Sequence, residues 1–367
     1  MNRTLLARII LITGALGIFA GIVLLLSGDP ALAGFFLIPG LILVAVAFQG
    51  VAGLSGYTYT TFIFAAVAVS MYFPGLFQGI GGFSFKSLII PLLQIIMFGV
   101  GSTMGLRDFE GVIKMPRPVI IGVVCQFTIM PVLGYTIARA FGFPPEIAAG
   151  IILVGSVPSG LASNVMSYIA NANVALSVTL TAVATLMAPV ITPVLMELLA
   201  GQYVPVQFTA MMLDITKIVI VPIAAGLLFN HFLGGRFPWL DKAMPRLSMV
   251  SIGAIITIIT AAGRDALLEV GLLLLVACLI HNLAGYLLGY HACRLLGMDE
   301  RSCRTIALEV GLQNSGLASG LALQMGRVAT VGLAPAIFGP LMNITGSTLA
   351  SWWHGRPVAD EPAPVKG

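Results

Sequence analysis

The chain has 367 residues, of which 58% are hydrophobic and only 9% are charged, and its formal net charge is +4. A soluble domain has about 25% charged residues, so 18 Lys and Arg with 14 Asp and Glu are too few to cover a soluble protein of this size. This composition excludes a cytosolic enzyme, a nucleic-acid-binding protein and a disordered chain. It predicts a membrane protein with many spans.

Twelve segments are apolar over a length that suits a membrane-spanning helix, which takes about 20 residues. Their long continuous runs favour helices over a β-barrel, whose strands alternate in polarity over about 10 residues. The sequence therefore predicts an all-α polytopic membrane protein. In chain order the segments are Leu5–Leu26, Phe35–Val51, Tyr57–Phe73, Leu88–Leu106, Val119–Phe141, Ile147–Ala170, Val174–Leu199, Phe208–Phe229, Leu247–Ala262, Leu267–Leu288, Thr305–Met325 and Val328–Trp352.

The distribution of basic residues predicts the orientation of these helices. With the amino terminus placed inside, the other Lys and Arg fall inside, except for Lys217 within a segment and four outside: Lys86, Arg139, Arg264 and Arg327. Because cytoplasmic loops carry the excess of Lys and Arg, both termini are predicted to be cytoplasmic. We expect an integral, multi-pass protein of the cell (inner) membrane.

Two short patterns recur along the chain at nearly the same offset. Leu-Gly-Tyr at 133–135 recurs at 288–290, an offset of 155, and Ser-Gly-Leu-Ala-Ser at 159–163 recurs at 315–319, an offset of 156. The interval holds five predicted spans, and an odd number inverts the second copy in the membrane. Inverted repeats are typical of secondary transporters, whose sites lie at the repeat interface near the middle of the bilayer.

The repeats divide the chain into three parts. Residues 57–353 are predicted to form a ten-helix core of two inverted five-helix repeats, about 57–201 and 207–353. Residues 1–56 add two amino-terminal transmembrane helices outside both repeats. Residues 354–367 are predicted to be a cytoplasmic tail.

Both copies of Ser-Gly-Leu-Ala-Ser lie in mid-span beside residues that interrupt helices. Pro158 removes a backbone donor, and glycines are poor helix formers. We expect two discontinuous helices, broken near 158–163 and 313–315. Unwound backbone at this depth persists only inside protein or beside a cavity, where its carbonyls can bind a cation and the restarted helices can face an anion.

Glu309 is the first candidate for a functional side chain, because it is a carboxylate within an otherwise apolar span. Gln313 lies four residues further on the same helical face, and the span has no Lys or Arg beside Glu309. An all-oxygen set of ligands suits a hard cation such as Na⁺. The alternative is a protonated, hydrogen-bonded structural Glu.

Five further residues in predicted spans have polar side chains. Ser177 and Thr181 are four residues apart on one helix face, either as ligands or bonded back to their own helix. The repeat offset relates Gln126 to His281, and we interpret Gln126 as functional and His281 as a buried structural residue. Asn343, near Pro340, is a candidate for lining a cavity.

These motifs resemble the bile acid:sodium symporter family. The resemblance covers about residues 57–353, and it depends on the runs at 160–168 (Gly-Leu-Ala-Ser-Asn-Val-Met-Ser-Tyr), 173–179 (Asn-Val-Ala-Leu-Ser-Val-Thr) and 309–314 (Glu-Val-Gly-Leu-Gln-Asn). It implies ten helices in two inverted repeats. The first, second, sixth and seventh of the ten would form a panel domain, and the others a core domain in which two broken helices cross.

The resemblance also implies a set of binding residues, with two Na⁺ ions. One Na⁺ site would use Ser163, Asn164, Ser177, Thr181 and Glu309. The second would use Glu309, Gln126, Gln313 and backbone carbonyls at Val310 and Leu312. The substrate would contact Leu161, Ala162, Ser163, Asn314 and Asn343. The family commonly has a hydroxyl residue or glycine at the position of Leu161, so a polar substrate contact there is in question.

The sequence therefore predicts a sodium-coupled symporter of organic anions that works by alternating access. The substrate is left open between bile acids and small carboxylates such as pantoate or pyruvate. The partners expected are the organic anion and the lipid bilayer, and no obligate protein partner is inferred. Two alternatives are a proton-coupled carboxylate transporter of the same fold, with Glu309 as the proton carrier, and an intramembrane enzyme using His281, Asn282 and Glu309.

Overall fold

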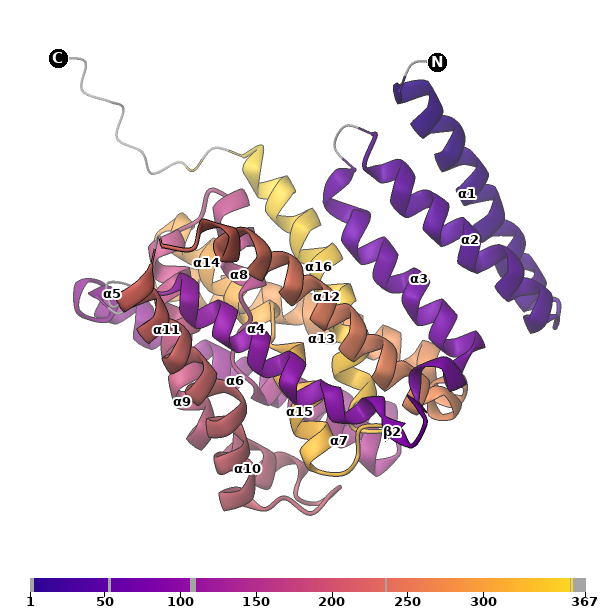
Figure 1. Cartoon of the computed structure of the whole chain (residues 1–367). Helices are drawn as coiled ribbons and strands as arrows, with labels where there is room; N and C mark the ends of the chain where they lie inside the picture. Colours follow the sequence, from indigo (N-terminus) through magenta and orange to yellow (C-terminus); the bar gives the residue numbers. More distant parts are fainter. Residues whose placement is uncertain (1–2, 52–53, 106–109, 235, 357, 359–367) are drawn as a thin grey trace.

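Helices account for nearly all of the regular structure in the computed structural model, which describes residues 3–51, 54–105, 110–234, 236–356 and 358 (Figure 1). The α-helices are α1 (Arg3–Leu26), α2 (Pro30–Phe48), α3 (Thr58–Tyr72), α4 (Ile89–Thr103), α5 (Glu110–Lys114), α6 (Pro116–Phe141), α7 (Pro145–Ser156), α8 (Ala162–Ile169), α9 (Val174–Ala200), α10 (Phe208–Ile215), α11 (Val221–Leu233), α12 (Pro238–Ala262), α13 (Arg264–Leu295), α14 (Glu300–Gly311), α15 (Ser315–Gln324) and α16 (Leu333–His354). Short 3₁₀ helices are η1 (Ser55–Tyr57), η2 (Pro74–Phe77) and η3 (Phe85–Leu88), and η5 (Thr216–Ile220) is a π-helix.

Each of the twelve predicted segments contains helix. Eight helices of the described chain are long and apolar enough to cross a membrane without interruption. Of the other predicted segments, one forms the 15-residue α3, two are broken, and the last forms the more polar α16. Large apolar side chains cover the outside, as Leu198 (74% exposed) and Leu272 (79%) illustrate. The protein is thus an all-α polytopic membrane protein.

Several helix boundaries differ from the predicted ones, and that of α2 has a clear cause. α2 begins at Pro30 rather than Phe35, because Asp29 caps it by accepting a bond from the Leu32 backbone N–H (3.1 Å) and proline is tolerated at the first helical position. Leu106, the predicted end of the fourth segment, lies outside the described residues. So do residues 359–367 of the predicted tail.

The amino-terminal hairpin of α1 and α2 lies at one edge of the molecule, beside α3 (Figure 1). Its helices pack closely, since a Cβ atom at Gly14 would lie 2.8 Å from the carbonyl oxygen of Gly40. α2 packs on α3, and α3 in turn contacts α12 and α16. The hairpin therefore reaches the rest of the protein mainly through α3.

A small antiparallel hairpin, β1 (Gly79–Ile80) and β2 (Phe83–Ser84), precedes η3. Gly81 and Gly82 form its turn with positive φ angles of 56° and 87°, a conformation that favours glycine. This hairpin is not among the predicted elements, because strands of two residues are too short to show an alternating pattern.

α4 and the segment α10–η5–α11 are in close backbone contact. A Cβ atom at Gly101 would lie 2.1 Å from the Ile223 carbonyl oxygen, so the two helices meet without an intervening side chain. Pro222 has no N–H to donate in the π-helical register, and Gln94 of α4 donates to the Lys217 carbonyl instead (3.3 Å). The π-helix is therefore stabilised from the neighbouring helix.

The two predicted helix breaks are confirmed and lie against each other. α7 ends at Ser156 and α8 begins at Ala162, whereas α14 ends at Gly311 and α15 begins at Ser315. In the gaps the Gly160 N–H donates to the Leu312 carbonyl (3.0 Å) and the Asn314 N–H to the Pro158 carbonyl (2.9 Å). These bonds flank an antiparallel bridge between Ser159 and Gln313. Backbone groups freed by the breaks thus satisfy one another.

Candidate functional site

The centre of the site is the carboxylate of Glu309, which is 2% exposed. It lies nine residues after the start of α14, or about 14 Å along the helix, close to half of a hydrocarbon core of about 30 Å. None of the ion pairs found among the described residues includes Glu309. The carboxylate is therefore buried near mid-membrane with only neutral partners.

Three hydroxyl groups donate to this carboxylate. Ser159 Oγ lies 2.5 Å from Oε2, Ser177 Oγ lies 2.5 Å from Oε1, and Thr181 Oγ1 lies 3.0 Å from Oε2 and 3.2 Å from Oε1. Ser159 comes from the break after α7, whereas Ser177 and Thr181 are one turn apart on α9. The site thus joins α14, α9 and the first break.

Two of these hydroxyls lie within hydrogen-bond distance of more oxygen atoms than their single proton can serve. Thr181 Oγ1 has one proton but lies within 3.3 Å of both oxygens of Glu309, of Asn164 Oδ1 and of Ser163 Oγ. Ser177 Oγ likewise lies 2.8 Å from Asn164 Oδ1 as well as beside Glu309. Because a hydroxyl donates only one bond, several lone pairs here are left for a cation. These five side chains are the ones expected at the first Na⁺ site.

A second polar group lies where the breaks cross. Gln126 of α6 donates through Nε2 to Gln313 Oε1 (2.9 Å) and to the Val157 carbonyl (3.1 Å), and it is 2% exposed. Gln313 donates through Nε2 to the Val310 carbonyl (2.5 Å). The buried Gln126 Oε1 has no hydrogen-bond partner among the described residues. An unsatisfied buried acceptor of this kind fits a cation.

The expected set of the second site is only partly assembled in the structure. Gln313 contacts both Gln126 and the Val310 carbonyl, whereas the Leu312 carbonyl accepts the Gly160 N–H beside the bridge. Glu309 accepts hydrogen bonds from Ser159, Ser177 and Thr181 and so belongs to the first polar group in this structure.

Sequence reasoning missed Ser159 as a contact of the carboxylate. Ser159 is 1% exposed and belongs to the first Ser-Gly-Leu-Ala-Ser pattern, so the repeat was the available signal. Val157, whose carbonyl accepts from Gln126, was missed too because a carbonyl group leaves no mark in the sequence.

A cavity of about 350 Å³ lies next to this polar centre. Its walls come from α4, α11 and α12 on one side and from both breaks, α9, α15 and α16 on the other. No charged side chain is among its lining residues, all of which lie in the described part of the chain. Leu161, Ala162, Asn314 and Asn343, expected to contact substrate, line it, whereas Ser163 is fully buried and donates to the Gly160 carbonyl (2.7 Å).

The restarted helices α8 and α15 both begin at this cavity. Asn314 caps α15, because its Oδ1 accepts from the Leu317 N–H (3.0 Å), and its neighbours Ser315 and Gly316 also line the cavity. Helix amino termini attract anions through their free N–H groups and the helix dipole. The wall can therefore favour an anion without a basic side chain.

His281, which the sequence interpretation treats as structural, lies away from Glu309. It is fully buried in α13, its Nε2 lies 2.9 Å from the Met130 carbonyl, and its ring packs edge-on against Phe338. Asn282 donates to the Gly311 carbonyl (2.8 Å) and accepts from Thr345 Oγ1 (2.6 Å), so it supports the end of α14. Neither residue is among the contacts of Glu309.

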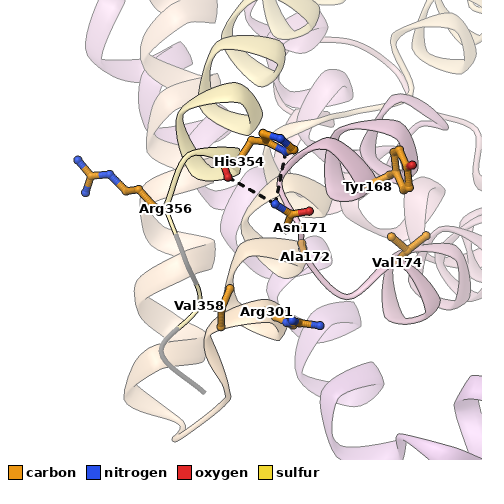
Figure 2. A pocket seen from close by; sticks show the side chains of 8 residues that line it. All are labelled: Tyr168, Asn171, Ala172, Val174, Arg301, His354, Arg356 and Val358. Atoms are coloured by element: carbon orange, nitrogen blue, oxygen red, sulfur yellow. Dashed lines mark hydrogen bonds between the residues drawn. The ribbon is translucent and has the colours of Figure 1, made fainter. Parts of the chain in front are cut away.

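A second cavity, of about 430 Å³, lies where the α8–α9 turn, α14 and the end of α16 meet (Figure 2). Asn171 has a positive φ of 51° in this turn and donates to the His354 carbonyl (3.5 Å). His354 Nδ1 donates to the Ile169 carbonyl (2.8 Å). Asn173 follows and caps α9 through the Leu176 N–H (3.0 Å). The bonds of His354 hold the end of α16 against α8 and the turn that follows it.

Comparisons with known proteins agree with this arrangement. A family model described as "Sodium Bile acid symporter family" matches residues 90–270. YocS of Bacillus subtilis (strain 168), an uncharacterized sodium-dependent transporter, is 40% identical over 307 residues, which cover 83% of this chain and 94% of that protein. The probable chloroplastic sodium/metabolite cotransporter BASS1 of Arabidopsis thaliana is 36% identical over 263 residues (71% and 65%).

A mammalian protein is also similar. The ileal sodium/bile acid cotransporter of Oryctolagus cuniculus is 32% identical over 255 residues, which cover 64% of this chain and 68% of that protein. The matches are to transporters, not to enzymes. With its buried carboxylate and membrane-spanning helices, the chain belongs to the sodium/bile acid symporter family and is an integral, multi-pass membrane transporter.

Proposed function

We propose that this protein is a sodium-coupled symporter of organic anions that works by alternating access. The observation that carries the proposal is the excess of oxygen acceptors around Thr181 Oγ1 and the buried Glu309 carboxylate, which forms no ion pair with any described residue. A hydroxyl can turn its proton away from the carboxylate and offer a lone pair to a bound cation. Oxygen-only ligands of this kind suit Na⁺ better than a transition metal.

Sodium coupling is favoured over proton coupling by the same contacts. The hydroxyls of Ser159, Ser177 and Thr181 surround the carboxylate with oxygens that can turn toward a bound cation. Asn164 adds a further oxygen that a proton relay does not need. Proton coupling is the alternative that the uptake experiment below must exclude.

A second Na⁺ is proposed beside Gln126 and Gln313. The free Gln126 Oε1 and the Val310 carbonyl supply oxygens close to the bridge between the breaks. Leu312 and Glu309 would complete the set after a local rearrangement. Two ions would make substrate uptake depend steeply on the sodium concentration.

The substrate is proposed to be an organic anion bound in the cavity of about 350 Å³. Its carboxylate would face the start of α15, where Asn314 and Asn343 can donate, and its apolar part would contact Leu161, which is 39% exposed, and α12. Bile acids and small carboxylates such as pantoate or pyruvate both have this chemistry. The names of the relatives, which include metabolite and bile acid cotransporters, support the same class.

Alternating access would arise from movement between two groups of helices on either side of the cavity. α3, α4, α10–α11 and α12 would form a panel domain, and the remaining helices of 57–353 the core domain. α7 and α14 have the same length and start 155 residues apart, which supports two inverted repeats. We place both termini in the cytoplasm and the protein in the cell membrane on the charge distribution.

The test is uptake into proteoliposomes with Na⁺ or choline outside at fixed pH. The Glu309→Ala variant should lose sodium-stimulated uptake of any anion that the wild type transports, and still purify as a folded protein. Glu197→Ala, at an exposed position near the end of α9, is the matched control and should transport normally. Full sodium-stimulated uptake by Glu309→Ala, or equal wild-type uptake in choline, would overturn the proposal.

A further inference from the structure

An apolar groove on the outside of the helix bundle lies between α13 and α16. It has a volume of about 640 Å³ and shares no lining residue with the cavity of about 350 Å³ beside Glu309. Leu287 (58% exposed) and Trp352 (51% exposed) show that the groove opens outward. Its lining residues are Leu283, Tyr286, Leu287, Tyr290, Ile344, Thr345, Thr348, Leu349, Trp352 and Trp353.

This groove continues along α13 into a further apolar cavity of about 420 Å³, which α3 and α12 help to line. The two share Ile344 and Thr345. From Leu267 to Tyr290 their lining along α13 extends over about 35 Å, close to the thickness of a hydrocarbon core. The apolar lining therefore suits lipid acyl chains, and its length exceeds the half of the core that the chains of one leaflet occupy.

The groove ends at an aromatic and basic mouth. Tyr290 and Trp353 stack at the end of the groove, with ring centroids 6.0 Å apart, where aromatic residues typically meet lipid headgroups. The Arg356 guanidinium lies 3.8 Å from the Trp352 ring centroid. Figure 2 shows the Arg356 side chain extending away from Asn171 and His354.

The position of Arg356 is fixed by a buried neighbour. Arg304, which is 3% exposed, donates from Nη1 and Nη2 to the Arg356 carbonyl, both at 3.3 Å. The Arg356 N–H donates to the Trp353 carbonyl (3.0 Å). Arg294, at the end of α13, forms an ion pair with Glu300 (3.9 Å), so the charge offered at the mouth is that of Arg356. The mouth thus carries positive charge at a defined place.

We propose that this groove binds an anionic glycerophospholipid, with an acyl chain between α13 and α16 and the phosphate at Arg356. Guanidinium groups bind phosphate through paired hydrogen bonds, and the aromatic mouth suits the glycerol region. Charge complementarity selects this occupant over a neutral lipid or a second apolar helix. The proposal does not depend on the identity of the transported anion.

Tryptophan fluorescence can test the headgroup preference. The chain has three Trp residues, and Trp239→Phe leaves only the pair at the groove. In this background, vesicles containing brominated phosphatidylglycerol should quench at least twofold more than vesicles with the same fraction of brominated phosphatidylcholine. Arg356→Gln should bring the ratio to about one, and Arg356→Lys should restore most of it.

Two controls separate this site from general attraction to lipid. Arg236→Gln removes an exposed charge that is predicted to lie on the same side of the membrane, and it should keep the twofold ratio. Leu349→Phe, which narrows the groove, should lower quenching by phosphatidylglycerol, whereas Leu198→Phe on α9 should not. Equal quenching by both lipids in the Trp239→Phe background, or the same loss in Arg236→Gln as in Arg356→Gln, would overturn the proposal.

Discussion

Ser159 donates its hydroxyl to Glu309 across 2.5 Å, and the two residues come from different broken helices. Ser159 also pairs with Gln313 in the antiparallel bridge, so one residue connects both polar groups of the site. Its side chain contacts the first group and its backbone borders the second. Substitutions at Ser159 are therefore expected to change how uptake depends on the sodium concentration.

Replacing Ser159 by Ala should weaken sodium-dependent activity without unfolding the protein. A hydrogen bond to a charged group contributes about 1.5–3 kcal/mol, so the half-saturating sodium concentration for uptake should rise about tenfold or more. Uptake measured against sodium concentration checks this. Ser156→Ala is the control, since the Ser156 hydroxyl is equally buried but donates to the Ile152 carbonyl of its own helix (2.8 Å). A similar shift in both variants would contradict the assigned role.

Asn314 has two separable roles, as the cap of α15 and as a cavity-lining amide. Asn314→Ser keeps a good cap but removes the amide donor, so stability should be retained while the KM for the anion rises several-fold. Asn314→Ala should in addition lower the free energy of unfolding by about 1 kcal/mol. Thermal unfolding and uptake kinetics distinguish the two. A wild-type KM in Asn314→Ser would exclude the amide as a substrate donor.

Gly311 ends α14 where Tyr286 of α13 packs against it. A Cβ atom there would lie 2.2 Å from the Tyr286 ring, so Gly311→Ala should push α13 and α14 apart and lower stability by about 1–3 kcal/mol. Gly253→Ala on α12 is the matched control, because nothing lies within 4 Å of its Cβ position. There alanine should be neutral or raise stability by up to about 1 kcal/mol. Thermal unfolding in detergent measures both, and equal melting temperatures would refute the packing argument.

Arg304 is a buried cation whose removal should be costly. It pairs with Glu300 (2.9 Å) and donates to the carbonyls of Ala170 and Trp353 (3.2 Å each), so Arg304→Gln should lower the free energy of unfolding by about 3 kcal/mol. Lys114→Gln breaks another i, i+4 ion pair, with Glu110, but both side chains are exposed. Its effect should stay below about 1 kcal/mol. A loss of similar size in the two variants in chemical denaturation would contradict this difference.

The helix breaks and most of the first polar group could be predicted because their signals are local. Pro158 interrupts a helix wherever it lies, and Glu309 stands out in an apolar span without knowledge of its neighbours. The repeat then related the two breaks. The structure brings Ser163, Asn164, Ser177 and Thr181 around Glu309, as the resemblance implied. Their roles in binding ions are still a prediction.

The parts that were not predicted depend on contacts between distant segments. Gln126 bonds the Val157 carbonyl, and any residue type would present the same carbonyl. The π-helix depends on Gln94 of another helix and on Pro222, and neither alone indicates it. The β1–β2 hairpin has too few residues to form a pattern. A sequence pattern shows which residue is present at a position. These features depend on which distant residue contacts it in the fold.

The antiparallel bridge fixes which residue of one break lies opposite which residue of the other, as the register of a β-sheet does. In such a pairing, a shift of one residue turns each side chain to the opposite face. A shift of this kind would take the Ser159 hydroxyl away from Glu309 and the Gln313 amide away from Gln126 together. Two backbone hydrogen bonds, between Gly160 and Leu312 and between Asn314 and Pro158, hold the alignment on which both polar groups depend.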